Sequence, residues 1–443
     1  MNRTADVIII GAGIIGCGTA FELAKKGYKT LNIDKLPEAG YGSTSNSCAL
    51  TRFFYSTWEG VAMSYEGLFY WKDWPNYLGV EDERGLAYYT ERGTIMLMTE
   101  GHDHAGVVRL YDEIGVKYEV WDVDTLKQKM PLFDVHAFWP PRPIDDPTFW
   151  DDPEQRLEGA VFTPQSGYMN DPQLATHNLF RAAQAKGGEF LFNNEVVEIR
   201  QENGRFGKLS AGRTQGITLK SGEKIDAPVV VNVAGPHSFV INRMAGVEAG
   251  MKIKTRALRH EVHHVPAPPN FNYEQNGHPV SDGDAGTYFR PEKGNRIAVG
   301  TEDPECDPRE YVEDPDSFVY QVSADQFKRQ VYRLARRIPD LPIPNQPQGV
   351  ADMYDVSDDW IPIYDKSDLP GFYMAVGTSG NQFKNAGIAG LMMAELIEAC
   401  ENGRDHDNDP VKITGPYTGL TLNAGFYSRL RDVNPDSTFT VRG

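Results

Sequence analysis

Residues 7–34 read VIIIGAGIIGCGTAFELAKKGYKTLNID, the pattern of a buried strand, a glycine turn, an amphipathic helix and a second strand that ends in an acid. Gly11, Gly13 and Gly16 have the GxGxxG spacing. The first glycine permits a tight turn, the second lets the backbone approach a pyrophosphate, and the third lets the helix pack on the strand. This stretch predicts a dinucleotide site at the start of the helix, where free N–H groups attract phosphate.

The second strand of this unit ends at Asp34, 18 residues after Gly16. A carboxylate in this place can accept hydrogen bonds from both ribose hydroxyls of an adenosine, and it disfavours the 2′-phosphate of NADP. We therefore include Asp34 and the adjacent Lys35 among the candidate cofactor residues, with Ile14 and Ile15 at the start of the helix.

Composition excludes several classes of protein. The chain has 443 residues and a net charge of −18, which disfavours nucleic acid or an anionic membrane surface as a partner. No apolar run approaches 18 residues, so we expect no membrane span. The four cysteines are scattered without a CxxC pair, which favours reduced thiols in a cytoplasmic protein and no metal site. They are Cys17, Cys48, Cys306 and Cys400.

The strand, glycine turn and helix pattern returns twice, at 229–238 (VVVNVAGPHS) and at 371–399. A β-rich block separates these two segments. A NAD domain needs no second such turn at its C-terminal end, whereas FAD is longer and its isoalloxazine needs a cradle of its own. The turn GTSGNQFKNAG is placed to offer N–H groups to the flavin, so the repeated pattern favours FAD over NAD.

Two further segments have a distinct composition. Residues 138–162 are dense in Pro, Asp and Trp, which predicts a surface excursion that is a lid, an interface loop or a decorative insertion. The tail beyond residue 410 is polar, and we expect it to wrap the surface. The economical division is an FAD-binding domain (1–85, 160–245 and 345–410), a substrate domain (86–159 and 246–344) and a C-terminal tail (411–443).

From residue 5 to about 400 the chain resembles the D-amino-acid oxidase superfamily of flavoproteins, and within it the monomeric sarcosine oxidase and glycine oxidase group. Four motifs carry the resemblance: GAGIIG (11–16), GSTSNSCALTRFFY (42–55), NVAGPHS (232–238) and DMYDVSDDWIPI…GFYMAVGTSGNQFKNAG (352–387). The resemblance implies an α/β fold, with an FAD-binding Rossmann-type (glutathione-reductase-like) domain and a second, β-rich mixed-sheet substrate domain. It also implies oxidation of an amine next to a carboxylate.

The resemblance assigns cofactor contacts to several turns. Val197 matches the position whose backbone meets the adenine. The remaining candidates lie in the GST turn, in NVAGPHS and in the C-terminal glycine turn: Ser43, Thr44, Ser47, Ala234, Gly235, Gly377, Gly380, Asn381, Gln382, Phe383 and Lys384.

Two cations match substrate-binding positions of the family. Arg52 matches the arginine that grips the substrate carboxylate, a task that suits the planar fork of a guanidinium. Its alternative is a solvated surface arginine, although its apolar neighbours make an unpaired charge costly. Lys384 matches a lysine near the flavin and the same carboxylate, where an ammonium could stabilise negative charge on the reduced ring. Its alternative is a helix-terminal lysine.

Three more residues are candidates for the substrate site. Tyr354 matches an active-site tyrosine of sarcosine oxidases, or is a core tyrosine. Arg290 lies where relatives carry a carboxylate-binding arginine, or it forms a structural pair with Glu292 or Asp284. His260 matches a segment that faces the flavin, where a neutral imidazole could accept the ammonium proton of the substrate.

The chain also departs from the family pattern. Asp352 stands where sarcosine oxidases attach the flavin through a cysteine, and Ser45 and Asn46 stand where other relatives use a histidine. We therefore expect FAD to be held non-covalently. Ala298 occupies the place of a lysine that helps oxygen accept electrons, with Arg296 two residues earlier, so the oxidase character is less secure than the oxidation of the amine.

The function predicted from the sequence is FAD-dependent oxidation of a primary or secondary amino acid, such as the N-substituted glycines sarcosine or iminodiacetate, to an imine that water hydrolyses to an amine and a carbonyl compound. Molecular oxygen is the favoured electron acceptor. The first alternative is an amino-acid dehydrogenase for glycine, proline or a D-amino acid that passes electrons to a quinone or a protein. Less favoured are a NAD-linked dehydrogenase and a flavoprotein subunit without turnover of its own.

Overall fold

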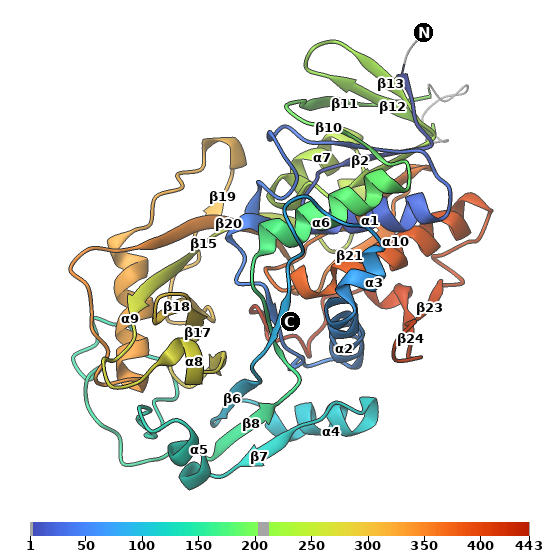
Figure 1. The fold of residues 1–443 in the computed structure, drawn as a ribbon. Coiled ribbons are helices and arrows are strands. Elements are labelled where there is room, and N and C mark those ends of the chain that lie inside the picture. The colour runs from blue at the N-terminus through green and yellow to red at the C-terminus, as the bar shows by residue number, and fades with distance from the viewer. Residues whose placement is uncertain (1–2, 203–211, 443) are drawn as a thin grey trace.

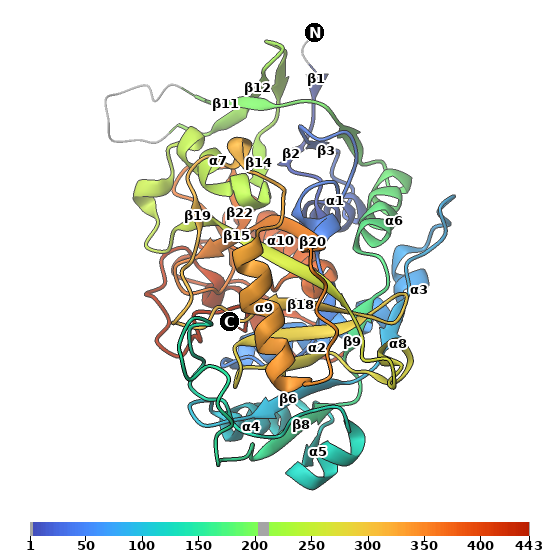
Figure 2. The same cartoon turned by 90° about the vertical axis from the view of Figure 1, so that its left-hand side faces the viewer.

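The computed structural model describes residues 3–202 and 212–442. Two sheet systems form it, one in the upper half of Figure 1 and one in the lower left, and the C-terminal end lies well inside the outline in both Figure 1 and Figure 2. The upper half is built on a sheet that is parallel except for β21. Its strand order is β10 (Glu189–Leu191), β3 (Thr30–Ile33), β2 (Val7–Ile10), β14 (Val229–Asn232), β22 (Phe372–Val376) and β21 (Ile363–Lys366).

The apolar run of β2 is buried on both faces of this sheet, as expected for a central parallel strand. Val7 and Ile9 pack into the cluster that contains the helices on one face, and Ile8 and Ile10 pack into the cluster on the other. The helices that contribute to the first cluster include α1 (Ile14–Lys25), α6 (Pro172–Ala185) and α10 (Ala386–Glu401).

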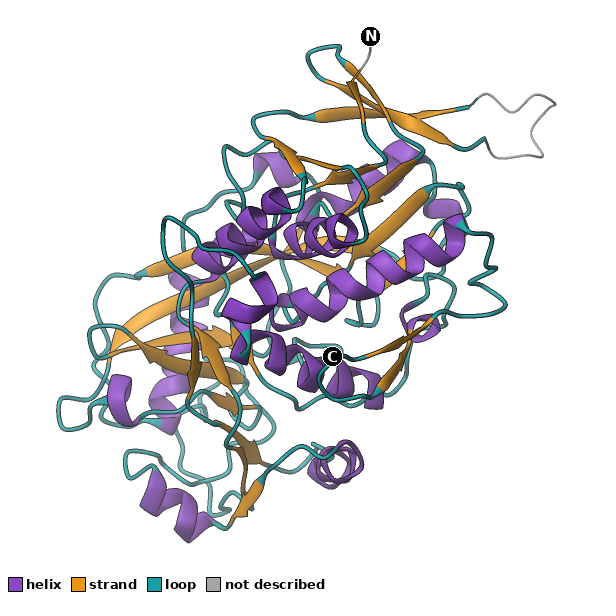
Figure 3. Ribbon diagram, turned by 45° about the vertical axis from the view of Figure 1, so that its right-hand side comes forward, coloured by secondary structure: helices purple, strands orange, loops and turns teal. Residues whose placement is uncertain are grey.

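The other face is covered by α7 (Ser238–Ala245) and by a small sheet that lies beyond it at the top of Figure 1. Figure 3 shows these layers as orange strands between purple helices. The small sheet has the order β1 (Arg3–Thr4), β13 (Lys224–Asp226), β12 (Thr214–Leu219) and β11 (Val196–Gln201).

The glycine turn between β2 and α1 has the geometry that its sequence requires. Gly11 has φ +119°, a region that side-chain-bearing residues rarely adopt, and a Cβ there would lie 2.5 Å from the carbonyl oxygen of Val233. A Cβ on Gly16 would lie 2.4 Å from the carbonyl oxygen of Gly11. The glycines therefore allow the helix to start directly against the strand.

The second sheet is mixed, and it is larger. Its order is β19 (Tyr311–Val312), β15 (Thr255–Pro266), β18 (Arg296–Thr301), β17 (Thr287–Glu292), β16 (Val280–Asp282), β6 (Thr94–Met98), β8 (Gly159–Thr163) and β7 (Glu119–Trp121), with β20 (Gly349–Ser357) paired to β15. Its apolar face packs on α9 (Ala324–Arg337), which runs down the front of Figure 2. The alternation of side chains along β15 and β20 sends every second residue to the opposite face.

The remaining elements are short strands and helices around these two sheets. The strands are β4 (Leu50–Thr51), β9 (Gly167–Met169), β5 (Tyr89–Glu91), β23 (Lys412–Thr414) and β24 (Thr421–Asn423). The helices are α2 (Trp58–Lys72), α3 (Trp74–Leu78), α4 (His104–Ile114), α5 (Val123–Lys129) and α8 (Tyr273–Asn276). No helix within residues 3–202 and 212–442 combines the length and the apolar character that crossing a membrane requires.

This architecture confirms the predicted α/β class with a second mixed sheet. The strand pairing differs from the predicted domain boundaries at two places. Residues 160–163, in β8, and residues 349–357, in β20, pair within the mixed sheet, although the boundaries group them with the cofactor-binding part. β8 and β20 belong to the mixed sheet because their hydrogen-bond partners, β6 and β15, lie far away in the sequence.

The proline-rich segment 138–162 is anchored to α9 by arginines. Arg336 donates hydrogen bonds to the carbonyl oxygens of Phe149 and Asp151, and Arg333 donates to that of Arg142. None of these residues lines the large cavity described below.

Candidate active site

One large cavity of about 720 Å³ runs from the glycine turn after β2 to residues of β15, β17 and β20 in the mixed sheet. Its volume lies in the range of about 300–1,000 Å³ that is usual for small-molecule sites. Every predicted cofactor residue except Gly377 lines it. The lining set comprises Gly11, Gly13, Ile14, Ile15, Gly16, Asp34, Lys35, Ser43, Thr44, Ser47, Val197, Ala234, Gly235, Gly380, Asn381, Gln382, Phe383 and Lys384.

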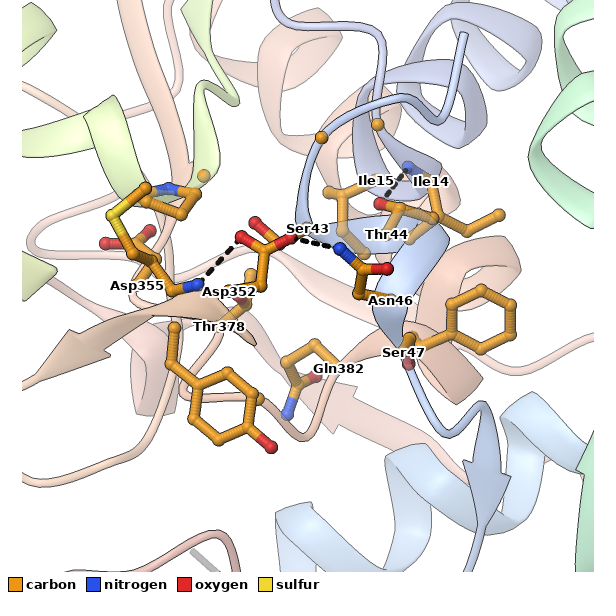
Figure 4. Close-up of a pocket in the computed structure, with 18 of the residues that line it drawn as sticks. Ile14, Ile15, Ser43, Thr44, Asn46, Ser47, Asp352, Asp355, Thr378 and Gln382 are labelled. Atoms are coloured by element: carbon orange, nitrogen blue, oxygen red, sulfur yellow. Dashed lines mark hydrogen bonds between the residues drawn. The ribbon is translucent and has the colours of Figure 1, made fainter. Parts of the chain in front are cut away.

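At one end, the start of α1 meets the GST turn. The backbone N–H of Ile14 donates to Thr44 Oγ1 at 3.3 Å, a contact drawn in Figure 4. A Cβ on Gly13 would lie 3.1 Å from the same hydroxyl oxygen. The absence of that Cβ keeps the helix N-terminus accessible to an anion.

Asp34 closes this end of the cavity. Its two carboxylate oxygens accept the N–H groups of Ala12, at 2.7 Å, and of Leu36, at 2.9 Å. Burial raises the pKa of Asp34, and these two hydrogen bonds oppose that rise. Each oxygen keeps a second lone pair, so the carboxylate can still accept a hydroxyl donor from a ribose.

Asp355, on β20, organises the second glycine turn. Its carboxylate accepts the N–H of Gly377 at 2.6 Å and the hydroxyl of Ser238 at 2.7 Å. Burial raises the pKa of Asp355 to about 7. Gly377 therefore shapes the turn without lining the cavity. Gly380 has φ +67°, and its missing Cβ leaves room for the ring of Tyr354.

Asp352 and Asn46 lie together on the cavity wall, as Figure 4 shows. Asn46 Nδ2 donates to Asp352 Oδ2 at 2.7 Å, and the N–H of Met353 donates to Asp352 Oδ1 at 2.7 Å. In the resemblance, Asp352 stands at one position of flavin attachment in relatives, and Asn46 stands with Ser45 at the other. Here a hydrogen bond joins them, and neither side chain is the cysteine or histidine that such a bond requires.

Arg52 is buried at the other end of the cavity. Its guanidinium donates to the carbonyl oxygens of Phe54, at 3.1 Å, and of Val441. The guanidinium carbon lies 4.7 Å from the ring centre of Phe54 and 4.8 Å from that of Tyr55. This placement excludes the solvated surface arginine, because the side chain is enclosed by aromatic rings and backbone.

Lys384 lies beside Arg52 in the short helical turn that precedes α10. Its Nζ donates to Tyr55 Oη at 2.7 Å and to the carbonyl oxygen of Asn381. Burial, followed by the charge of Arg52, lowers the pKa of Lys384 well below its usual range. Trp71 fixes the turn by donating its Nε1 hydrogen to the carbonyl oxygen of Lys384 at 2.7 Å.

His260 and Tyr354 both face the cavity from the mixed sheet. Their rings are stacked, with centres 3.9 Å apart and planes at 19°. His260 Nε2 lies 3.1 Å from Asp303 Oδ2, and neither ring nitrogen has a hydrogen bond of good geometry among the described residues.

Arg290 is the one catalytic candidate that does not line this cavity. Its Nη2 pairs with Glu292 at 2.9 Å, and its guanidinium packs on the ring of Tyr168 at 5.0 Å. The structure thus places Arg290 in the structural pair that was its alternative. Residues two apart on a strand share a face, which explains the pairing.

Sequence reasoning did not find Glu302 and Arg442, which also line the cavity near Arg52. Glu302 accepts the hydroxyl of Ser281, and burial raises its pKa. Arg442 comes from the tail that we expected to wrap the surface. No motif marks either residue, because their partners lie far away in the sequence.

These residues fit an extended FAD. The glycine turn, Thr44 and Asp34 suit the pyrophosphate and the adenosine ribose at one end. The turn at Gly380–Lys384 suits the isoalloxazine at the other end, beside Arg52 and His260. Such a cofactor would supply a two-electron acceptor next to the guanidinium of Arg52.

A separate cluster brings Asp82, Glu83 and His177 together, with ligand atoms within 4.8 Å of one another. His177 Nδ1 lies 2.8 Å from Asp82, and Arg181 pairs with Glu83 at 3.2 Å. Protein groups therefore satisfy these atoms, and the absence of a metal site stays a prediction.

Several known proteins are similar to this chain along most of its length. The chain is 25% identical over 408 residues to mitochondrial sarcosine dehydrogenase of Mus musculus. The aligned region covers 90% of this chain but only 40% of that protein. It is 23% identical to glycine oxidase of Geobacillus kaustophilus (strain HTA426), covering 91% of the chain and 96% of the relative. The crystal structure of L-proline dehydrogenase from P. horikoshii superposes with a TM-score of 0.73 at 20% identity, covering 97% and 98% of the two chains.

The family described as DAO, FAD dependent oxidoreductase, matches residues 6–396. The match confirms the resemblance on which the cofactor assignment depends. The chain belongs to the DAO family of FAD-dependent oxidoreductases.

Proposed function

We propose that the protein uses non-covalently bound FAD to oxidise an amino acid at the carbon between its amino and carboxylate groups. The observation that carries the proposal is the buried guanidinium of Arg52, which lines the cofactor cavity together with Lys384 of the second glycine turn. A buried guanidinium is stable only with acceptors around it. In a chain of net charge −18, this local positive charge is suited to a carboxylate.

Arg52 would bind the substrate carboxylate. Two of its N–H groups donate to backbone carbonyls, and these contacts fix the guanidinium plane. The other N–H groups of the fork remain for the two oxygens of a carboxylate. Arg52 would thereby orient the adjacent C–H bond toward the flavin, and positioning of this kind contributes a large part of catalysis.

His260 would accept the proton of the substrate ammonium. His260 lines the cavity, and its two ring nitrogens are buried without a hydrogen-bond partner within the described part of the chain. Asp303, 3.1 Å from Nε2, would stabilise the imidazolium that results. Loss of this proton frees the nitrogen lone pair, which is needed when the C–H bond gives up a hydride. The resulting imine is hydrolysed by water to an amine and a carbonyl compound.

Two classes of electron acceptor fit the proposed reaction. The relatives named above include both a dehydrogenase and an oxidase. Ala298, at the position where a lysine would help oxygen, is buried and does not line the cavity. We favour oxygen as the acceptor, with a quinone or a protein as the alternative.

The test is anaerobic mixing of the FAD-loaded protein with a panel of amino acids that includes sarcosine, iminodiacetate, glycine, proline and D-alanine. The proposal predicts loss of the blue flavin absorption band with at least one of them. Admission of air then separates the acceptors, because an oxidase recovers the band rapidly and a dehydrogenase slowly. A preparation loaded with FAD that no amino acid bleaches, but that NADH does, would overturn the proposal.

A further inference from the structure

The C-terminal segment, residues 433–442, runs into the cavity. Val441 and Arg442 line it. The side chain of Val441 packs against Leu258, Val356 and Trp360. Upstream, the hydroxyl of Ser437 donates to the carbonyl oxygen of Asp359 at 2.6 Å. The segment is therefore seated on the protein, and it delivers one charged side chain to the site.

Within the described residues, the donor groups of Arg442 are only partly paired. Its two terminal nitrogens lie 3.2 and 2.7 Å from the ring nitrogens of His102. Burial and the charge of Arg442 lower the pKa of His102 to about 3, so this ring is neutral and can accept at only one nitrogen. Among the described residues, Arg442 Nε has no hydrogen-bond partner.

The carboxylate of Glu302, which faces Arg442, is also incompletely paired among the described residues. Glu302 Oε2 lies 3.6 Å from Arg442 Nε, beyond hydrogen-bond distance, and it has no hydrogen-bond partner within the described residues. Glu302 is held on its other oxygen by Ser281. It can orient the Arg442 guanidinium without occupying all of its donors.

Arg52 and Arg442 act on the same region of the cavity. Arg52 donates to the carbonyl oxygen of Val441, the residue before Arg442. The charges of both guanidiniums oppose the rise in the pKa of Glu302, and the charge of Arg52 contributes to lowering the pKa of Arg442. Two guanidiniums therefore act electrostatically on one buried carboxyl group, and an anion in the cavity would balance the remaining positive charge.

We propose that Arg442 is a specificity-determining residue that, with Arg52, selects an amine carrying two carboxylates. This inference rests on the proposed function and narrows its substrate class. Arg52 takes the carboxylate next to the carbon that is oxidised, and Arg442 takes the second one through the N–H groups that are unpaired among the described residues. Arg442 would thus take the carboxylate-binding role that the resemblance implied for Arg290, which pairs with Glu292 instead.

The experiment measures binding of two non-oxidisable probes, succinate and butyrate, to the FAD-loaded protein by the change in flavin absorption. The two probes have the same chain length and differ by one carboxylate. We expect Arg442→Met to weaken succinate binding roughly 10- to 100-fold, while butyrate binding changes less than about 3-fold. Arg442→Lys, which keeps the charge, should recover part of the succinate affinity.

Arg309→Met is the matched control. Arg309 donates to the carbonyl oxygen of Phe439 in the same segment, but it does not line the cavity. This variant should leave the ratio of succinate to butyrate affinity unchanged. Equal loss of both probes in Arg442→Met, or no loss of succinate, would overturn the inference.

The two proposals can fail separately. If amino acids bleach the flavin but succinate affinity does not depend on Arg442, the proposed function stands and the inference is wrong. If succinate affinity depends on Arg442 but no amine bleaches the flavin, the proposed function is wrong, and the charge preference of the cavity stands.

Discussion

Arg52 is the residue on which the proposed chemistry depends most. Its guanidinium is enclosed by two aromatic rings and held by the carbonyl oxygens of Phe54 and Val441. We predict that Arg52→Ala lowers kcat/KM for the amino-acid substrate by about 100- to 1,000-fold, because a bidentate charge-assisted contact is lost. The FAD content should stay near that of the wild type, since Arg52 lies away from the ADP end of the cavity.

The measurement is steady-state kinetics together with the ratio of flavin to protein absorbance. Arg243→Ala is the control, because Arg243 pairs with Glu248 on the surface. A loss in Arg52→Ala no larger than in this control would remove Arg52 from the substrate site.

Arg290 and Arg442 show which residues of the site can be predicted from the sequence and which cannot. Residues within the family motifs, such as Arg52 and Lys384, do line the cavity, because each motif carries its own local geometry. Arg290 matched a motif position, but the neighbouring Glu292 pairs with it. Arg442 lies far from its partners along the chain, and only tertiary structure brings them together.

At the level of elements, the close packing of α1 on α10 supports the glycine turn. A Cβ on Gly390, in α10, would lie 2.5 Å from the carbonyl oxygen of Gly18, in α1. We predict that Gly390→Ala lowers the free energy of unfolding by about 1–2 kcal/mol. Overpacking costs about 1–3 kcal/mol, and the better helix propensity of alanine offsets up to about 1 kcal/mol.

Chemical denaturation of the FAD-loaded protein measures this change. Gln128→Ala, at an exposed position of α5, is the surface control and should shift the free energy by less than about 0.5 kcal/mol. A Gly390→Ala protein as stable as this control would show that the two helices separate at little cost.

Asp355 links β20 to the turn after β22, and it makes the stability of this link depend on pH. Its pKa in the folded protein is raised to about 7, above the ordinary value of 3.8, because the carboxyl group is buried. A raised pKa favours the protonated form in the folded state. The contribution is therefore present at low pH and is lost as the pH rises through about 7.

We predict that wild type loses up to about 4 kcal/mol of unfolding free energy relative to Asp355→Asn between pH 4 and pH 8. The quantity to follow is the difference between the two proteins at each pH, so any constant cost of the substitution cancels. A difference that is flat or rises with pH would contradict the raised pKa.

Among the elements, those within one motif were the most predictable. The strand, the turn and the helix of residues 7–25 can be predicted from the apolar run at 7–10 and from the spacing of the glycines at 11–16. The placement of β20 was not predicted. The sequence analysis assigned these residues to the FAD-binding domain together with the turn that follows them, whereas the backbone of β20 pairs with β15 along Thr255–His263. The sequence of one strand does not specify which distant strand completes its hydrogen bonds.

For the whole molecule, the cofactor is central, since one cavity joins both glycine turns. We predict that acid precipitation releases all of the flavin as free FAD into the supernatant, because Asp352 and Asn46 occupy the positions of attachment in relatives. Absorption of the supernatant and of the washed pellet measures the two fractions. Yellow colour that stays with the pellet would show a covalent bond, for which Cys48 on the cavity wall would then be the first residue to examine.

The fold class of the whole chain was predictable from the sequence, whereas the position of the tail beyond residue 410 was not. The predicted α/β architecture holds, and the large cavity lies between the two sheet systems as a cofactor-dependent enzyme requires. The tail was expected on the surface because it is polar, yet Arg442 reaches the interior. A polar composition cannot distinguish a solvated segment from one whose charges are paired inside a site.

The most direct measurement is a crystal structure of the FAD-loaded protein with butyrate bound. The account predicts the isoalloxazine at the turn of Gly380–Lys384 and the carboxylate of butyrate about 3 Å from the guanidinium nitrogens of Arg52. A carboxylate that binds away from Arg52, or a flavin ring placed at the Asp34 end of the cavity, would contradict it.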